Sequence, residues 1–360
     1  MGKTATPILH DKLYTLETAL DETAMREVFA QMVTTHWGTD FELIGLRIEV
    51  MRRRNQRCVI RYITEMYDRR EERRTEWRIV GKVYKAGRGE SVFITMQDLW
   101  RNGLSRASTD GISMPEPIAF SSELCLLYQE EVPGEPIKHV LKKDIGNPKP
   151  MRLLARTLAK LHQTAIDAGE AYSIDDHLLR CHPRYPFLCL AYPELEPKIE
   201  YIIRKAKAFE AENSQIRFAT VHGDFHLGQV HVEGEHAWLI DYDALCHADP
   251  AADVGNLMVF LKGKAKRYPE WRMQVEAFLD EYYAIMGAQV AERVPLYEAL
   301  THIRRACKCL RYQEKDWRRK VEKMIDQGVA CIDALPTQAS DAPYTTEKEL
   351  LQNGTIELVG

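Results

Sequence analysis

The stretch that decides the fold is residues 220–243, which read TVHGDFHLGQVHVEGEHAWLIDYD. Apolar residues stand on both sides of Gly234, and a glycine between two such runs predicts a β-hairpin whose turn needs a positive φ. Pairing across this hairpin would place residues 228 and 229 beside Ile240 and Asp241. Polar groups that are distant in the sequence would therefore converge at the open end of the hairpin.

The polar residues of this stretch suit the transfer of a phosphoryl group. That reaction needs one carboxylate to accept or orient the attacking hydroxyl, and further oxygen ligands to hold the Mg²⁺ that neutralises the phosphates. Asp224 lies in the loop before the hairpin and is our candidate for the catalytic base. Asp241 and the side-chain amide of Gln229 are candidate magnesium ligands, because Mg²⁺ prefers oxygen donors and keeps several waters.

Three neighbours of these residues have less specific expected roles. Asp243 either binds a second Mg²⁺ or satisfies backbone amides, and the sequence leaves both alternatives open. His222 and His226 have the four-residue spacing of a metal site, but Gly223 between them disfavours the helix that would align them. We therefore expect both histidines to brace the loop through hydrogen bonds.

The rest of the chain predicts an α+β fold, because strand patterns come first and helix patterns follow. The predicted strands cover 41–50, 56–65, 76–85 and 124–128, and the predicted helices cover 11–37, 91–102, 150–167, 196–212 and 270–332. The mixed-charge run 68–74 predicts a solvated turn between two strands. Pro133 and Gly134 favour a turn that ends the sheet region.

These patterns divide the chain into four parts. The predicted parts are a helical extension at 1–40, a smaller lobe with an antiparallel sheet and a helix at 41–131, a larger and mainly helical lobe with the hairpin at 132–335, and a tail at 336–360.

Composition excludes several classes of function. The chain has 360 residues, 45% of them hydrophobic, so it can bury a substantial core. The net charge of −4 gives no positive field for nucleic acid. No apolar run reaches the roughly 20 residues of a membrane helix. The eight cysteines lack the spacing of a zinc site, and we expect reduced thiols in a cytoplasmic protein. The sequence does not indicate the oligomeric state.

Three motifs carry a resemblance to a known family. They are HGDFH at 222–226 with Gln229, LIDYD at 239–243, and DPAADVGNL at 249–257. In this order they resemble the core of the aminoglycoside phosphotransferase family of small-molecule kinases, which is distantly related to the protein kinases. The variant GDFHLGQ at 223–229 is also similar to the corresponding stretch of maltokinases. The resemblance implies a protein-kinase-like fold of two lobes, with ATP in the cleft between them.

The resemblance implies roles for the catalytic residues. It makes Asp224 the catalytic base and Asp241 the principal metal ligand. The family usually has Asn where this chain has Gln229, and the longer side chain moves the carbonyl oxygen by about one methylene. Asp253 would brace the catalytic loop. The segment 158–162 resembles the helix signature that often precedes that loop.

The resemblance extends to the site of the nucleotide phosphates. IVGKVY at 79–84 resembles the strand whose lysine reaches these phosphates, which makes Lys82 the candidate and Lys85 its competitor. The nearest carboxylate on the following helix, the usual partner of that lysine, is Glu90. A glycine-rich loop of the protein-kinase type is absent from the sequence, so what covers the phosphates is left open.

The stretch 127–134 resembles the hinge, whose backbone groups, here at Glu130 and Val132, would read the adenine edge. Together these motifs imply an enzyme that uses ATP and Mg²⁺ to phosphorylate a hydroxyl group of a small molecule. The maltokinase-like variant suggests a sugar or oligosaccharide as the alternative acceptor. A catalytically weak pseudokinase that binds nucleotide is the alternative from another class, because Gln229 departs from the family pattern.

Overall fold

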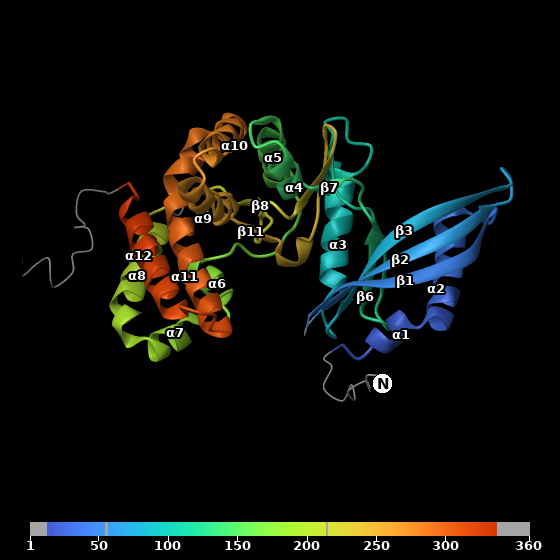
Figure 1. Ribbon diagram of the computed structural model, residues 1–360, viewed down its shortest axis with the longest axis horizontal. Helices are drawn as coiled ribbons and strands as arrows, with labels where there is room; N and C mark the ends of the chain where they lie inside the picture. Colours follow the sequence, from blue (N-terminus) through green and yellow to red (C-terminus); the bar gives the residue numbers. More distant parts are fainter. Residues whose placement is uncertain (1–12, 55–56, 214, 337–360) are drawn as a thin grey trace, which may run out of the picture. The chain divides into compact units, whose positions relative to one another are not determined.

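This computed structural model describes residues 13–54, 57–213 and 215–336, and these form two compact units. Unit 1 contains the described chain up to Ile137 together with the segment Gly228–Asp243. Unit 2 contains Lys138–Leu227 and the described chain from Ala244 onward. The longer strands lie in unit 1 and most helices in unit 2 (Figure 1), which confirms the predicted α+β class.

Unit 1 is built on an antiparallel sheet of five strands in the order β1-β2-β3-β6-β5 (Figure 1). The strands are β1 (Phe41–Arg54), β2 (Arg57–Asp68), β3 (Arg73–Tyr84), β5 (Pro117–Ser121) and β6 (Leu126–Glu130). The predicted three-strand meander is confirmed, and its 69–72 turn is exposed as expected. The register places Val59 opposite Lys82 and Arg57 opposite Tyr84. These four side chains therefore lie on one face of the sheet.

Two N-terminal helices, α1 (Leu16–Leu20) and α2 (Glu22–Trp37), belong to the core of unit 1. The side chain of Asp21 caps α2 by accepting a hydrogen bond from the backbone of Ala24 at 2.8 Å. Phe29 of α2 is fully buried, and its ring centroid lies 4.8 Å from that of Tyr62 in β2. The segment that we predicted as an extension is thus packed on the sheet.

The hairpin predicted around Gly234 is present as β9 (Val230–Glu233) and β10 (His236–Leu239). Gly234 has a φ of 59°, so the turn uses the conformation for which glycine is suited. Ile240 continues the pairing by donating its backbone N–H to the carbonyl of Gln229 at 2.9 Å.

The hairpin belongs to a second, four-stranded sheet of unit 1. Its outer strands are β4 (Ile112–Ser113), which pairs with β10, and β7 (Glu135–Pro136), which pairs with β9. Our sequence-based division placed the hairpin in the later, helical part of the chain. The compact units differ from that division because both sheet partners of the hairpin precede residue 138. One further helix of unit 1, α3 (Glu90–Leu99), follows β3.

Unit 2 is mainly helical. Its helices include α4 (Ile137–Lys143), α5 (Lys149–Gln163), α6 (Ile174–Leu179), α7 (Tyr185–Ala191), α8 (Glu196–Glu212), α9 (Ala251–Arg267), α10 (Trp271–Met286), α11 (Val294–Tyr312) and α12 (Trp317–Asp333). A short antiparallel pair, β8 (Ala219–Val221) and β11 (Cys246–Ala248), lies among them. The predicted helix at 196–212 is confirmed in full, and α5 confirms the one predicted at 150–167 as far as Gln163. The loop with Asp224 begins directly after β8, so this pair sets where the loop starts.

Close packing between α9 and α11 fixes the helices behind this loop. Gly255 of α9 faces α11, where an added Cβ would lie 2.7 Å from the Cβ of Tyr297. No real side chain fits at that distance, so the glycine permits the close approach of the two helices.

Within the described residues, no helix is long and apolar enough to cross a membrane.

Candidate active site

The loop that carries Asp224 is held in one conformation by glycine. Gly223 has a φ of 77°, and a Cβ there would lie 2.2 Å from the carbonyl oxygen of Ala244. Both the backbone conformation and the lack of space therefore require glycine. The Asp224 that follows is exposed to solvent. The loop thus presents a carboxylate outward from a fixed backbone.

Asp253 of α9 holds the backbone N–H groups at the start of the loop. Its Oδ2 accepts from His222 N at 2.7 Å, and its Oδ1 accepts from Gly223 N at 2.8 Å. The Asp253 side chain is 1% exposed. Burial alone would raise the pKa of Asp253, but the hydrogen bonds with the His162 side chain and with the His222 backbone hold that pKa below its usual range. Asp253 therefore stays ionised and acts on both amides.

His162 completes this buried network. Its Nε2 lies 3.2 Å from Asp253 Oδ2, and its Nδ1 lies 2.7 Å from the hydroxyl of Tyr282. The sequence placed His162 in a signature helix without giving it a contact. The Nδ1 of His222, itself fully buried, accepts a long bond of 3.4 Å from the backbone of Asp224, and His226 is half-buried.

Arg180 and Asn256 hold the carbonyl groups on either side of Asp224, and Arg304 supports Asn256. Arg180, just after α6, donates to the carbonyl oxygen of Gly223 at 3.0 Å and to that of Ala244 at 2.6 Å. Asn256 of α9 donates to the carbonyl oxygen of Phe225 at 2.8 Å, and Arg304 donates to Asn256 Oδ1 at 2.5 Å. Burial lowers the pKa of Arg304, and the charge of Asp224 opposes this effect. The carbonyl groups of Gly223 and Phe225, on either side of Asp224, are therefore each held by a side chain from outside the loop.

Sequence reasoning missed both arginines. Arg180 is 43 residues from Gly223, and Arg304 is 48 residues from Asn256. No motif or spacing links them to the loop, because the packing of α6 and α11 alone brings them there. They carry two positive charges next to Asp224. In the part of the chain that the structure describes, neither forms an ion pair with a carboxylate within 4.0 Å.

The second cluster of candidate residues lies in unit 1, at the open end of the hairpin. Lys82 Nζ lies 3.1 Å from Asp241 Oδ1 and 3.4 Å from Asp243 Oδ1. The hydroxyl of Tyr84 donates to Asp243 Oδ1 at 2.7 Å. Lys82 is 5% exposed, so its charge needs these partners. The lysine predicted for the nucleotide phosphates and the carboxylates predicted for the metal are therefore brought together.

Arg57 is a fifth member of this cluster, and sequence reasoning missed it. Its Nη1 lies 2.8 Å from Asp241 Oδ1 and its Nη2 lies 3.3 Å from Asp241 Oδ2, and it also contacts Asp243 Oδ2. A usable signal was present in the sequence. Counting the strand register outward from the predicted 68–74 turn places Arg57 on the face of Lys82.

Asp241 is held in an unusual state by this cluster. Its φ is 71°, which is uncommon for a residue with a side chain, although Asp tolerates it better than most. Burial alone would raise the pKa of Asp241, but the charge of Lys82 and the hydrogen bond from Arg57 outweigh it and hold that pKa well below its usual range. Asp241 is therefore ionised at all ordinary pH values.

The donor set fits a hard divalent cation such as Mg²⁺. Asp241 and Asp243 converge on the same ammonium group, so their oxygens lie within reach of a single ion. Gln229 precedes β9 and is 6% exposed. Its backbone carbonyl accepts a hydrogen bond from the backbone N–H of Ile240, the neighbour of Asp241. All three predicted ligands belong to unit 1, whereas Asp224 belongs to unit 2.

The remaining predicted nucleotide residues are placed as follows. Lys85 is exposed, so Lys82 is the better-placed of the two lysines. Glu90 was wrongly expected as the partner of Lys82; it is exposed at the start of α3, and Asp241 and Asp243 contact the lysine instead.

The predicted hinge residues lie at the end of β6. Glu130 is buried as the last residue of the strand, its carboxylate pairs with Arg106, and its backbone N–H donates to Glu116 O at 2.9 Å. Val132 lies two residues further on and is half-buried.

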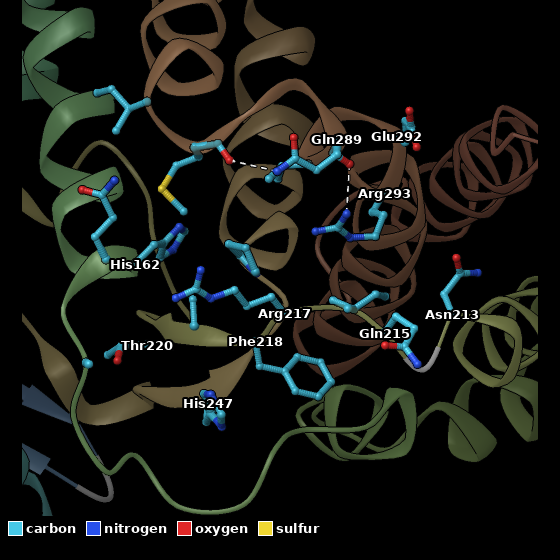
Figure 2. A pocket seen from close by; sticks show the side chains of 18 of the residues that line it. His162, Asn213, Gln215, Arg217, Phe218, Thr220, His247, Gln289, Glu292 and Arg293 are labelled. Carbon is cyan, nitrogen blue, oxygen red and sulfur yellow. Dashed lines mark hydrogen bonds between the residues drawn. The ribbon is translucent and has the colours of Figure 1, made fainter.

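A cavity of about 930 Å³ lies inside unit 2 (Figure 2). Its walls come from segments 162–166, 209–213, 215–220 and 285–293, with His162 and Thr220 on the side next to the loop. Figure 2 shows the side chain of Arg217 extending into the cavity toward His162. Asp224 does not line it, so this cavity is not where an acceptor hydroxyl would meet that carboxylate.

The fold and these two clusters define a protein of the kinase-like class. Residues 64–295 match the phosphotransferase enzyme family, and the chain belongs to this family. No match is found among curated proteins.

Several solved structures share the fold at low sequence identity. A choline/ethanolamine kinase family protein from Mesorhizobium loti has a TM-score of 0.53 and 14% identity, with 86% of this chain and 95% of that chain covered. Amicoumacin kinase hAmiN, in complex with AMP-PNP, Ca²⁺ and Ami, has a TM-score of 0.56 and 15% identity, with coverage of 90% and 98%. A thermostable mutant of aminoglycoside phosphotransferase APH(4)-Ia, in a ternary complex with AMP-PNP and hygromycin B, has a TM-score of 0.55 and 12% identity, with coverage of 85% and 98%.

Proposed function

We propose that this protein is an ATP-dependent kinase that transfers the γ-phosphoryl group to a hydroxyl group of a small molecule. The observation that carries the proposal is the convergence of Lys82, Asp241 and Asp243 in one cluster. A lysine and two carboxylates are the groups that position a triphosphate and its metal ion in phosphoryl transfer. The family match and the AMP-PNP bound in two of the similar structures support the same chemistry.

Each predicted residue has a role in this proposal. The backbone at Glu130 and Val132 reads the adenine edge, and Lys82 holds the phosphates. Asp241, with Gln229 and Asp243, would hold Mg²⁺, which when bound neutralises charge between the phosphates.

The reaction then follows from position and charge. The acceptor oxygen forms a bond to the γ-phosphorus while the bond from that phosphorus to the bridging β-oxygen breaks, so ADP leaves. Asp224 takes the proton of the acceptor hydroxyl. His222, Asp253 and the two arginines keep Asp224 in place, and such positioning supplies much of the rate in this type of reaction.

A sugar or oligosaccharide is the second candidate for the acceptor, beside an aminoglycoside or another amino-alcohol. The specific observation that favours it is the positive charge of Arg180 and Arg304 next to Asp224. A polycationic acceptor would be repelled there, whereas a neutral polyol would accept hydrogen bonds from a guanidinium. The Leu227-Gly228-Gln229 variant in the loop points to the same class.

The proposal is tested by incubating the full chain with ATP, Mg²⁺ and a panel of sugars and amino-alcohols. We expect ADP release and an acceptor that is heavier by one phosphoryl group, with both lost in Asp224→Asn. Asp175→Asn is the matched control, because Asp175 is an exposed aspartate of α6 that pairs with the surface Lys207. ATP binding without transfer to any acceptor would instead favour a pseudokinase module.

A further inference from the structure

Arg57 occupies the oxygens that the proposed function assigns to a metal ion. Its guanidinium bonds to both oxygens of Asp241, at 2.8 and 3.3 Å, and also contacts Asp243. The side chains of Arg57 and the two aspartates are 19% and 24% exposed, so water screens these contacts only partly. The arrangement is a forked pair between a guanidinium and a carboxylate, which is a strong type of ion pair.

The strand register makes Arg57 and Lys82 neighbours. Arg57 lies opposite Tyr84 in the β2–β3 ladder, and Lys82 lies opposite Val59, so both cations project from the same face. Both reach Asp241 Oδ1. Two cations thus balance two carboxylates, and the cluster is neutral without any ligand.

A bound metal–nucleotide would break this balance. A divalent cation needs the lone pairs of Asp241 and Asp243, and a guanidinium cannot keep its bonds to the same lone pairs. The triphosphate meanwhile brings several anionic oxygens, and a guanidinium binds phosphate with the same forked geometry as carboxylate. Once the metal ion displaces it, the Arg57 guanidinium can therefore form equivalent hydrogen bonds to the phosphate oxygens.

We propose that Arg57 exchanges partners. Without nucleotide it occupies Asp241 and Asp243 and competes with the metal ion; with metal–nucleotide bound it moves to the phosphates as a second cation beside Lys82. This inference rests on the proposed function. It makes Arg57 a phosphate-binding residue in a chain whose sequence has no glycine-rich loop to cover the phosphates.

The test uses Arg57→Met in the full chain and measures two binding constants. Mn²⁺ is titrated without nucleotide, with electron paramagnetic resonance to count free Mn²⁺, and AMP-PNP is titrated calorimetrically with Mg²⁺ present. We expect Arg57→Met to bind Mn²⁺ about tenfold more tightly, because a competitor is gone, and AMP-PNP about tenfold more weakly, because a phosphate contact is gone.

Two further variants make the outcome decisive. Arg74→Met removes an exposed arginine of the same sheet, which pairs with Glu65, and should change neither constant. Arg57→Lys keeps the charge but not the fork, so both constants should move in the same directions by smaller factors. It also serves if Arg57→Met does not fold.

Opposite shifts of the two constants support the exchange. Unchanged constants, or a loss of both affinities together, would overturn it and leave Arg57 a purely structural residue. Failure of the proposed function looks different, because the unaltered protein would then either bind no AMP-PNP or bind it and transfer no phosphoryl group from ATP.

Discussion

The two clusters of candidate residues are built in opposite ways. In unit 2 the supports of Asp224 act on the backbone: Asp253 holds two N–H groups, and Arg180 and Asn256 hold two carbonyls. In unit 1 the supports act on the charged groups themselves, since Arg57 and Lys82 pair directly with the carboxylates. The unit 2 cluster fixes the position of Asp224. The unit 1 cluster holds its carboxylates in ion pairs whose cations a ligand can replace.

This difference shows that the catalytic carboxylate needs a rigid backbone, whereas the metal and phosphate site needs ion-pair partners that can be exchanged. A catalytic base must keep its place through the reaction, and anchors on the peptide groups leave its own carboxylate free for the substrate. A site for metal and phosphate must accept new partners when it is filled, and buried charges that are paired while it is empty avoid an uncompensated desolvation cost. We therefore expect damage to the unit 2 cluster to affect folding and turnover, and damage to the unit 1 cluster to affect ligand binding.

The largest expected effect comes from breaking the frame at Asp253. Asp253→Ala leaves two buried N–H groups and His162 without their acceptor, so the free energy of unfolding should fall by about 3 kcal/mol. Turnover should fall as well. Denaturant unfolding measures the first effect and ADP release the second.

A surface aspartate provides the control for this change. Asp326 is 57% exposed and pairs with Lys198, so Asp326→Asn should change the unfolding free energy by less than about 0.5 kcal/mol. An Asp253→Ala protein as stable as the parent would show that the buried network does not hold the loop.

A smaller effect is expected when Lys82 is removed from the unit 1 cluster. Lys82→Ala should weaken AMP-PNP binding about tenfold, because one charge-assisted phosphate contact is lost. Lys85 is exposed three residues later, and Lys85→Ala should leave the affinity unchanged. Calorimetric titration of both variants decides between the lysines, and a reversed result would mean that Lys85 reaches the phosphates.

The smallest expected effect is a pH dependence of the unfolding free energy that comes from unit 2. Burial lowers the pKa of His302 in α11 to about 4, below the value of about 6.5 in an unfolded chain. The unfolded state therefore binds more protons, and this stability is lost as pH falls from about 6.5 toward 4. We expect a loss of up to about 1 kcal/mol per pH unit in this window.

His302→Gln should reduce this slope in urea unfolding at about pH 7 and pH 5.5, and His177, whose pKa burial also lowers to about 4, should account for the rest of it. Asp241 does not titrate in this window, because its pKa lies well below it. The charge of Asp241 should therefore be the same at both pH values. An unchanged slope in His302→Gln would show that His302 is not the group that titrates.

The motifs predicted the local structure of both clusters well. The hairpin turn at Gly234 and the approach of Gln229 to Ile240 follow from the alternation of apolar residues alone. Lys82 and Asp241 are 159 residues apart in the sequence, and only the family resemblance suggested that the two would meet.

The parts that could not be predicted depend on packing between distant elements. Arg180 and Arg304 reach the loop only because α6 and α11 pack beside it, and a helix pattern gives no partner for its polar side chains. The hairpin joined unit 1 because β4 and β7, two residues each, pair with it, and strands this short leave almost no periodic signal.

The most direct test of the whole account measures Mg²⁺-dependent AMP-PNP binding in Asp224→Asn and Asp241→Asn side by side. The account predicts that Asp224→Asn binds the analogue as tightly as the parent protein but transfers nothing from ATP, whereas Asp241→Asn loses the part of the affinity that depends on Mg²⁺. Loss of binding in Asp224→Asn together with unchanged, Mg²⁺-dependent binding in Asp241→Asn would contradict the division of roles between the two clusters.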